Sequence, residues 1–457
     1  MRRSTILLVN QSILLNIPRI SITSRQLQDV IVIGCGASGI AALRRLHDAG
    51  LKVIGLEAAP RIGGRICTTP FGENVVDIGA AWCHGETANV VFELSNPHEL
   101  LGRPSPDENW YVLSGGSLAP NNLVQETVTA LSNAVKESSK DNALSISQCI
   151  KKAAESNESL RNSPLYNSII EWYERANHLG GQDDPRQGKS LRGLSENWPC
   201  TGEFMLNWKG RGYKTILDVL LNKYPDPSKE IPVEILLNKE VESIRWGSSQ
   251  SELDSTNPLV HVKCTDGSLY STKSTIVTVS VGVLKERHNQ LFNPPLMPEK
   301  IKAINNLELC VLNKIYVEFT EPDLQCQHCG LSAQRAVDVL LMMERASEDE
   351  VKTGVENFLE IFKHNFDITS VKSIIRSQWA SNPLIRGAYS YRSVTTEEEG
   401  GSALELSEPL YHAERFPVVC FGGEATSHHR HNSVHGAIEA GFREADRLVQ
   451  CFGKMKC

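Results

Sequence analysis

The clearest pattern of apolar and polar positions lies between residues 29 and 60. Residues 30–33 form a short continuous apolar run, which is typical of a strand buried on both faces of a parallel sheet. Apolar residues then recur at helical spacing over 40–46, and Gly50 follows as a helix-ending glycine. Residues 52–56, which are apolar after Lys52, are predicted to form a second strand. The pattern predicts a strand, a helix and a second strand within about thirty residues, which is the size of a βαβ unit.

The rest of the chain divides into polar helical stretches and β-rich stretches. Asp266-Gly267, between two apolar stretches, is a hairpin signal. In chain order, the pattern predicts helices over 105–225, strands over 231–285, a helix over 296–308, a strand over 312–319, an acidic helix over 346–365 and a charged surface loop over 396–401.

Three glycines follow the first strand at the spacing of a dinucleotide-binding turn. Gly34 makes the tight turn, Gly36 lets the backbone approach a pyrophosphate, and Gly39 lets helix and strand pack closely. The helix N-terminus offers free N–H groups and a positive dipole end to the phosphates. Glu57 ends the second strand, where an acid accepts hydrogen bonds from a ribose. Together these features predict a dinucleotide site; the alternative is a glycine-rich turn without a ligand.

The glycine turn does not separate NAD from FAD, but the residues after Glu57 do. Gly63 and Gly64 let a second stretch of backbone fold against the pyrophosphate, and Arg65 can clamp it. The run VVDIGAAWCHG follows over residues 75–85. With this run, the chain resembles the flavin-containing amine oxidases, and among them the animal polyamine oxidases.

The resemblance recurs along nearly the whole chain after residue 28. It is carried by VESIRW at 241–246, IVTVSVGVLK at 276–285, LNKIYVEF at 312–319, WASNPLIRGAYSY at 379–391 and FGGEATSHHRHNSVHGAIEAG at 421–441. The cofactor contacts that it implies are Gly34, Gly36, Ser38, Gly39, Glu57, Arg65, Gly79, Ala80, Ala81, Trp82, Val241, Trp379, Glu424 and Val434. The catalytic residues that it implies are Lys314 and His84, and the substrate contacts are His84, Tyr389 and Ser433.

The resemblance also implies roles for single side chains. Lys314 would hold a water at flavin N5, with a pKa lowered by burial. Trp82 would pack near the cofactor, and His84 would face the substrate. Glu424 would approach the ribityl and phosphate part of FAD. A helix beginning near Val434 would direct its positive end at the N1–C2=O edge of the flavin. The structural alternatives are an exposed strand-edge lysine, a core tryptophan and a loop histidine.

The implied reaction is oxidation of the C–H bond beside an amine nitrogen of spermine, spermidine or an N1-acetyl derivative. FAD takes the hydride equivalent, the imine hydrolyses to an aldehyde and a shorter amine, and O2 reoxidises the flavin with release of H2O2. No cysteine stands near Ala388 and Tyr389, so we expect non-covalent FAD. A histone-demethylase-like oxidase and a flavin-binding protein with little turnover are the alternatives.

We therefore expect an α/β fold in which a Rossmann-like FAD-binding domain is combined with a discontinuous α+β substrate-binding domain. Around residues 320–341 the chain is shorter than the polyamine oxidases that it resembles, which is the reason for the low-turnover alternative. Residues 1–28 are rich in arginine and serine and are expected to be a targeting or disordered leader. The expected FAD-binding domain comprises 29–104, 214–300 and 372–457, and the substrate-binding domain comprises 105–213 and 301–371.

The composition excludes several classes of partner and site. A net charge of −7 argues against binding to nucleic acid. The 12 cysteines are scattered along a chain too long for a disulfide scaffold. The histidines between 428 and 435, and the pair Cys326 and Cys329, lack completing ligands, so we expect no metal. No apolar run is long enough to span a membrane. We expect a cytoplasmic monomer, or a mitochondrial one if the leader is a transit peptide; the ending GKMKC is not a peroxisomal signal.

Overall fold

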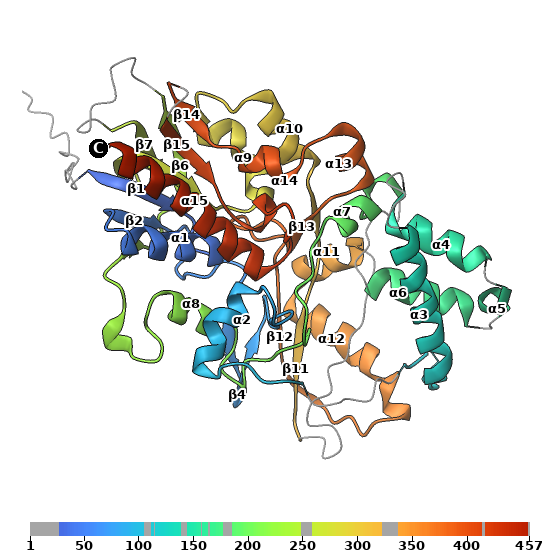
Figure 1. Ribbon diagram of the computed structural model, residues 1–457. Helices are drawn as coiled ribbons and strands as arrows, with labels where there is room; N and C mark the ends of the chain where they lie inside the picture. Colours follow the sequence, from blue (N-terminus) through green and yellow to red (C-terminus); the bar gives the residue numbers. More distant parts are fainter. Residues whose placement is uncertain are drawn as a thin grey trace, which may run out of the picture.

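The chain folds around one large mixed sheet, with a separate group of helices to one side (Figure 1). The sheet has nine strands. This computed structural model describes residues 27–104, 111–113, 115–138, 144–156, 158–162, 165–176, 185–247, 258–321, 337–413 and 416–455.

The βαβ unit predicted from the sequence lies in the middle of the sheet. β1 (Gln28–Ile33) leads into α1 (Ala37–Asp48), which leads to β2 (Val53–Leu56). β1 pairs in parallel with β2 on one side and with β8 (Leu269–Val277) on the other. All of β2 and the last four residues of β1 are buried. The continuous apolar runs therefore reflect strands that are covered on both faces.

Segments from distant parts of the sequence complete the sheet. The strand order is β5-β2-β1-β8-β7-β6-β9, and β15 joins it by pairing in parallel with β8 and antiparallel with β14. Asp266-Gly267 lies between the antiparallel strands β7 and β8, as predicted for a hairpin, and Gly267 has a φ of 83°. The remaining strands of the sheet are β5 (Glu234–Leu236), β6 (Val241–Trp246), β7 (Val260–Cys264), β9 (Phe292–Asn293), β14 (Leu410–His412) and β15 (Phe416–Phe421).

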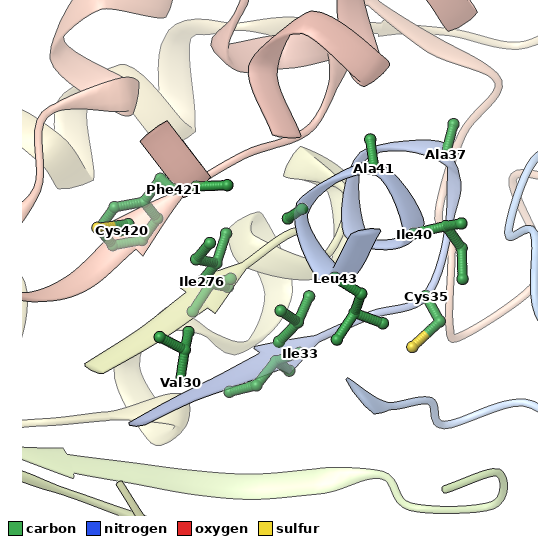
Figure 2. Packing of buried hydrophobic residues seen from close by; sticks show 14 of the residues in the cluster. Val30, Ile33, Cys35, Ala37, Ile40, Ala41, Leu43, Ile276, Cys420 and Phe421 are labelled. Atoms are coloured by element: carbon green, nitrogen blue, oxygen red, sulfur yellow. The ribbon is translucent and has the colours of Figure 1, made fainter. Parts of the chain in front are cut away.

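The two ends of the described chain meet where α1 packs against α15 (Val434–Met455), seen side by side in Figure 1. Glycines make this contact close. A Cβ added at Gly441 would lie 2.1 Å from the carbonyl oxygen of Ser38, and one at Gly39 would lie 1.9 Å from that of Gly34. Beneath α1, the apolar side chains of the sheet form the main core (Figure 2).

Smaller elements surround this body. Helices α3, α4 and α6 enclose an apolar core of their own that includes Leu131 and Ile150. The three two-stranded sheets are β3 (Thr68–Phe71) with β4 (Asn74–Asp77), β10 (Glu308–Cys310) with β13 (Tyr389–Tyr391), and β11 (Ile315–Phe319) with β12 (Val371–Arg376). The other helices are α2 (Val90–Ser95), α3 (Asn121–Ser138), α4 (Ile146–Ser156), α5 (Glu158–Arg161), α6 (Tyr166–Ala176), α7 (Leu191–Ser195), α8 (Thr215–Leu220), α9 (Val281–Leu291), α10 (Pro298–Asn306), α11 (Val337–Arg345), α12 (Glu348–Leu359), α13 (Val394–Glu399) and α14 (Ala403–Ser407).

The prediction of a charged loop over 396–401 was wrong, because helix α13 covers most of it. Ser393 begins the helix with a capping box: its hydroxyl accepts from the N–H of Thr396, and the hydroxyl of Thr396 accepts from the N–H of Ser393. The acidic side chains are also paired, since Glu398 contacts Arg186 and Glu397 contacts Arg392. A capping signal, the neighbouring Arg392 and the distant Arg186 therefore stabilise this charged run as a helix.

Two predicted features lie largely outside the described residues. These are the leader, of which 1–26 are not described, and the shortened region, of which 322–336 are not described. The two-domain division stays a prediction. None of the helices in the described ranges is long and apolar enough to cross a bilayer.

Changing Gly39 to alanine is expected to cost about 1–3 kcal/mol in free energy of unfolding, because the new methyl group would collide with the backbone oxygen of Gly34. Gly354 is a matched control: it lies inside α12 with nothing within 4 Å of an added Cβ. Gly354→Ala should stabilise by about 0.5–1 kcal/mol. Urea unfolding of the two variants and the parent chain measures both effects, and equal stabilities would contradict the tight contact at Gly39.

Candidate functional site

A pocket of about 570 Å³ opens where β1, β2 and β8 end. Its lining includes Ile33 and Leu56, the last residues of β1 and β2, and Thr278, which follows β8. Ligands of open α/β sheets bind at this edge, and the volume suits a small-molecule or cofactor site. The predicted site residues that line the pocket are Gly34, Gly36, Ser38, Glu57, Arg65, Gly79, Ala80, Ala81, Trp82, His84, Val241, Lys314, Trp379, Tyr389, Glu424, Ser433 and Val434. Gly39 lies outside the lining, where it packs α1 against the turn.

The glycine turn leaves room and free donors for an anionic ligand. Gly34 has a φ of 91°, which favours glycine, and α1 begins after Gly36 with no side-chain cap and no acid in its first turn. The N–H groups of that turn are therefore available to phosphates. Gly64 faces Gly36, since a Cβ added at Gly64 would lie 3.5 Å from the Gly36 Cα. A side chain at either position would fill the space between the two backbone segments.

Glu57 lies at the end of β2, and hydrogen bonds from backbone N–H groups orient both of its carboxylate oxygens. Its Oε2 accepts from the N–H of Cys35 at 2.7 Å, and its Oε1 accepts from the N–H of Ala59 at 2.9 Å. Each oxygen keeps a lone pair that can accept from a ribose hydroxyl. The arrangement suits the ribose of a dinucleotide.

Arg287 is a pocket residue that the sequence reasoning missed. It contacts the Oε1 of Glu240 at 2.5 Å through Nη1 and donates to the carbonyl of Val241 at 3.2 Å through Nη2. It comes from α9, and its partners come from the start of β6. No local pattern marks it, because its contacts join segments that are far apart in the sequence.

Glu424 is a buried carboxylate, 5% exposed, that joins three segments of the site. Arg65 contacts its Oε1 at 2.8 Å, the hydroxyl of Ser390 donates to its Oε2 at 2.7 Å, and the N–H of Asn432 donates to its Oε2 at 2.9 Å. Burial alone would raise the pKa of Glu424, but Arg65 and these hydrogen bonds outweigh it and lower the pKa. The carboxylate is therefore ionised, and its position is fixed by the groups around it.

Lys314 precedes β11 and reaches back into the pocket. Its Nζ donates to the carbonyl of Gly79 at 2.5 Å and to that of Asp77 at 3.2 Å. Burial lowers the pKa of Lys314 to about 8, although the Asp77 carboxylate acts in the opposite direction. Trp379 supports the same stretch by donating its indole N–H to the carbonyl of Ile78 at 3.2 Å. Lys314 is a half-buried pocket residue, so the alternative of an exposed lysine does not hold.

His84 faces the pocket from the loop after β4, beside Trp82. Its Nδ1 lies 2.8 Å from the carbonyl of Phe204. A carbonyl only accepts, so Nδ1 carries the proton, and Nε2 of the neutral ring is an acceptor. Burial lowers the pKa of His84, and Lys314 lowers it further, while the Phe204 carbonyl acts in the opposite direction. Trp82 lines the pocket and is 39% exposed, so it is not a core tryptophan.

Ser433 and His435 lie at the start of α15. The Ser433 hydroxyl donates to the carbonyl of Arg430 at 2.7 Å and accepts from the N–H of Gly436 at 3.0 Å. This hydroxyl therefore caps the helix, which leaves it one lone pair for a substrate. His435 lines the pocket and is 8% exposed. Burial lowers its pKa to about 4, with Arg430 and His84 adding to the effect.

Two of the other clustered histidines, His428 and His429, contact the loop after α7. The ring of His429 stacks on Trp198 with centroids 3.5 Å apart, and His428 Nε2 lies 3.4 Å from Glu196 Oε2. Within the described ranges, no group of three or more His, Cys, Asp or Glu side chains could hold a metal ion. These histidines join the C-terminal segment to the helical region.

Removing the charge of Glu424 is expected to weaken the fold at neutral pH. Glu424→Gln should lower the free energy of unfolding by about 2–4 kcal/mol, because Arg65 loses its buried partner. Since the folded pKa of Glu424 is lowered, its contribution is full above the ordinary pKa of 4.5 and is lost as the pH falls through the folded value. In urea titrations, the difference between variant and parent should therefore stay constant between pH 7 and about pH 4.5 and shrink only below that pH.

The matched control for Glu424 is the exposed pair of Arg45 and Asp446. Asp446→Asn should cost less than about 1 kcal/mol. A pH-independent loss in Glu424→Gln, or a loss no larger than that of the control, would contradict the ionised buried carboxylate.

Comparison with known proteins supports a cofactor site in this pocket. The family model "Flavin containing amine oxidoreductase" matches residues 37–449. Peroxisomal N(1)-acetyl-spermine/spermidine oxidase is 27% identical in Bos taurus and 28% in Homo sapiens, each over 92% of this chain and 94% of the relative. Lysine-specific histone demethylase 1B of Mus musculus is 26% identical over 92% of this chain but only 53% of that protein. This chain belongs to the flavin-containing amine oxidoreductase family and is an FAD-dependent amine oxidase.

Proposed function

We propose that the chain is a polyamine oxidase, which converts spermine, spermidine or their N1-acetyl derivatives and O2 to an aldehyde, a shorter amine and H2O2. The observation that carries the proposal is one pocket that combines a dinucleotide turn with Lys314 and His84. The bovine and human relatives, whose names specify N(1)-acetyl-spermine/spermidine, support this substrate class. The demethylase-like alternative is weaker, because this chain covers little more than half of that relative.

The pocket fits FAD in both shape and donors. Gly36 and Gly64 leave a backbone cradle that a Cβ would fill, and the first turn of α1 keeps free N–H groups. We propose that Glu57 holds the adenosine ribose, that the turn at Gly34 holds the pyrophosphate, and that Val434 lies at the flavin. Among the described lining residues there is no cysteine, which supports non-covalent FAD. When bound, FAD accepts the hydride equivalent from the carbon beside the amine nitrogen.

The side chains of this chain would prepare the amine for that transfer. An amine must be neutral to give up a hydride equivalent, so its proton has to leave first. Nε2 of His84 is the free acceptor of a neutral ring and can take a hydrogen bond or a proton from the amine. Lys314 would hold the water that is placed near the reacting centre, and Tyr389 would flank the substrate.

Two acids, Glu196 and Glu203, are candidates for binding a distal ammonium group. Glu196 is already committed, because it contacts Arg392 and Arg192. Burial would raise its pKa, but these arginines outweigh burial and lower it to about 2. Glu203 lies beside Phe204 at the His84 loop, where the carbonyl of Glu203 accepts from the N–H of Gly85 at 2.9 Å. Glu203 is the better placed of the two.

The proposal also includes the cellular compartment and the oligomeric state of the protein. We propose a cytoplasmic monomer, with the mitochondrion as the alternative if residues 1–28 are a transit peptide. The bovine and human relatives are named peroxisomal. Imaging of the full chain with a C-terminal and with an N-terminal tag would separate these compartments.

An anaerobic visible spectrum of the purified protein tests the proposed function. Adding spermine or N1-acetylspermine should bleach the flavin bands, and admitting O2 should restore them with release of H2O2. A flavin spectrum that no polyamine changes would favour the alternative of a flavin-binding protein with little turnover, whose basis is the short region around 320–341. Bleaching by a methylated lysine peptide alone would favour the demethylase-like alternative.

Lys314→Met is expected to lower kcat/KM for the polyamine by about 10²-fold while FAD content stays unchanged, because one positioned donor is lost. Lys300 is the matched control. Its pKa is also lowered to about 8 by burial, and its Nζ donates to the carbonyls of Glu405 and Leu406, but it lies outside the pocket lining. Lys300→Met should lower stability and leave kcat/KM of the folded enzyme unchanged. Equal kinetic losses in both variants would contradict a specific role for Lys314.

A further inference from the structure

Phe204 makes two separate contacts with the pocket residue His84. Its carbonyl oxygen lies 2.8 Å from Nδ1 of the histidine, and its ring stacks on the imidazole with centroids 4.2 Å apart and planes 26° from parallel. The ring is nevertheless 57% exposed. An exposed phenylalanine that covers a half-buried histidine is not explained by packing of the core, because its outer face stays in water.

Backbone hydrogen bonds hold the segment around His84 against the segment around Phe204. The N–H of Cys83 donates to the carbonyl of Leu206 at 3.0 Å, and that of Gly85 donates to the carbonyl of Glu203 at 2.9 Å. His84 and Phe204 lie between these two bonds on facing stretches of chain. The position of the Phe204 carbonyl is therefore fixed by backbone bonds on both sides, and the contact does not depend on a flexible side chain.

We propose that Phe204 is the positioning residue of His84: its carbonyl sets the tautomer, and its ring sets the plane of the imidazole and shields one face from water. His84 then presents Nε2 to the pocket as an acceptor. What His84 does with that acceptor rests on the proposed function, in which it takes a hydrogen bond or a proton from the substrate amine. The role of Phe204 in holding the His84 ring does not depend on that function.

The groups that act on His84 are consistent with a ring kept neutral. Lys314 is near enough for its charge to lower the pKa of His84, and His84 in turn lowers the pKa of His435. Burial is the largest cause of the lowered pKa of His84, and the Phe204 carbonyl is the group that opposes it. Removing the Phe204 ring would admit water to the imidazole while the backbone carbonyl stays in place. The added hydration and the remaining carbonyl would then both favour the protonated form of His84.

The same segment provides a matched control. Trp198 is 55% exposed and stacks on His429 with centroids 3.5 Å apart and planes 6° from parallel. His429 does not line the pocket. Trp198→Ala therefore removes an equally exposed aromatic ring from a histidine of the same region without touching His84.

The test is a histidine titration by NMR of the FAD-loaded enzyme labelled with 13C-histidine, with the His84 signal assigned from its loss in His84→Gln. Phe204→Ala should raise the pKa of His84 toward the ordinary imidazole value. Phe204→Leu keeps an apolar cover and should give a smaller rise. Trp198→Ala should leave the titration of His84 unchanged.

In the kinetics, Phe204→Ala should lower kcat/KM about tenfold at neutral pH and move the acid limb of its pH profile to higher pH.

An unchanged His84 titration in Phe204→Ala would overturn the proposal, as would an equal shift in Trp198→Ala. The titration needs no turnover, so it separates this proposal from the proposed function. If no amine bleaches the flavin but the titration shifts, the polyamine oxidase assignment fails and the positioning role stands. If polyamines are oxidised but the titration does not move, the positioning role alone fails.

Discussion

The structure depends on the close approach of three backbone segments at two glycines. Gly39 lets α1 lie directly on the turn after β1, and Gly441 lets α15 lie directly on Ser38 at the start of α1. Any side chain at these positions would collide with a backbone oxygen, which cannot move aside as a flexible side chain can. The contact brings the N-terminal strand, the first helix and the C-terminal helix together. The helix starts at Ala37 and Val434 consequently reach the same pocket.

Polar links extend this contact across the pocket. The hydroxyl of Ser38 accepts from the N–H of Gly423, directly before Glu424. The carboxylate of Glu424 then holds Arg65, Ser390 and Asn432. A buried carboxylate with one arginine and several hydrogen-bond donors is stable only when all of them are in place. The C-terminal segment is therefore fixed to both the turn region and the strand β13.

The sequence predicted the elements that depend on local rules and missed those that depend on distant partners. The βαβ unit followed from apolar runs and glycine spacing, with β2 starting one residue later than expected, at Val53. The charged stretch 396–401 was wrongly predicted as a loop, although Ser393 and Thr396 carried a capping signal. Arg287 and Phe204 could not be predicted, because the first acts through segments far away in the chain and the second by facing His84 across a loop. The resemblance to amine oxidases, not the pattern, pointed to Lys314.

Burial at the Lys314 end of the pocket has a consequence for the proposed chemistry. It lowers the pKa of Lys314, His84 and His435, and each of the two histidines is lowered further by a neighbouring basic group. The same burial and the same neighbours would act on any amine that enters, since a positive charge on it is disfavoured for the same physical reasons. A polyamine placed there would bind with its reacting nitrogen neutral and its other nitrogens charged nearer to water. The pocket that keeps His84 and His435 neutral would therefore also favour the reactive, neutral form of the substrate amine.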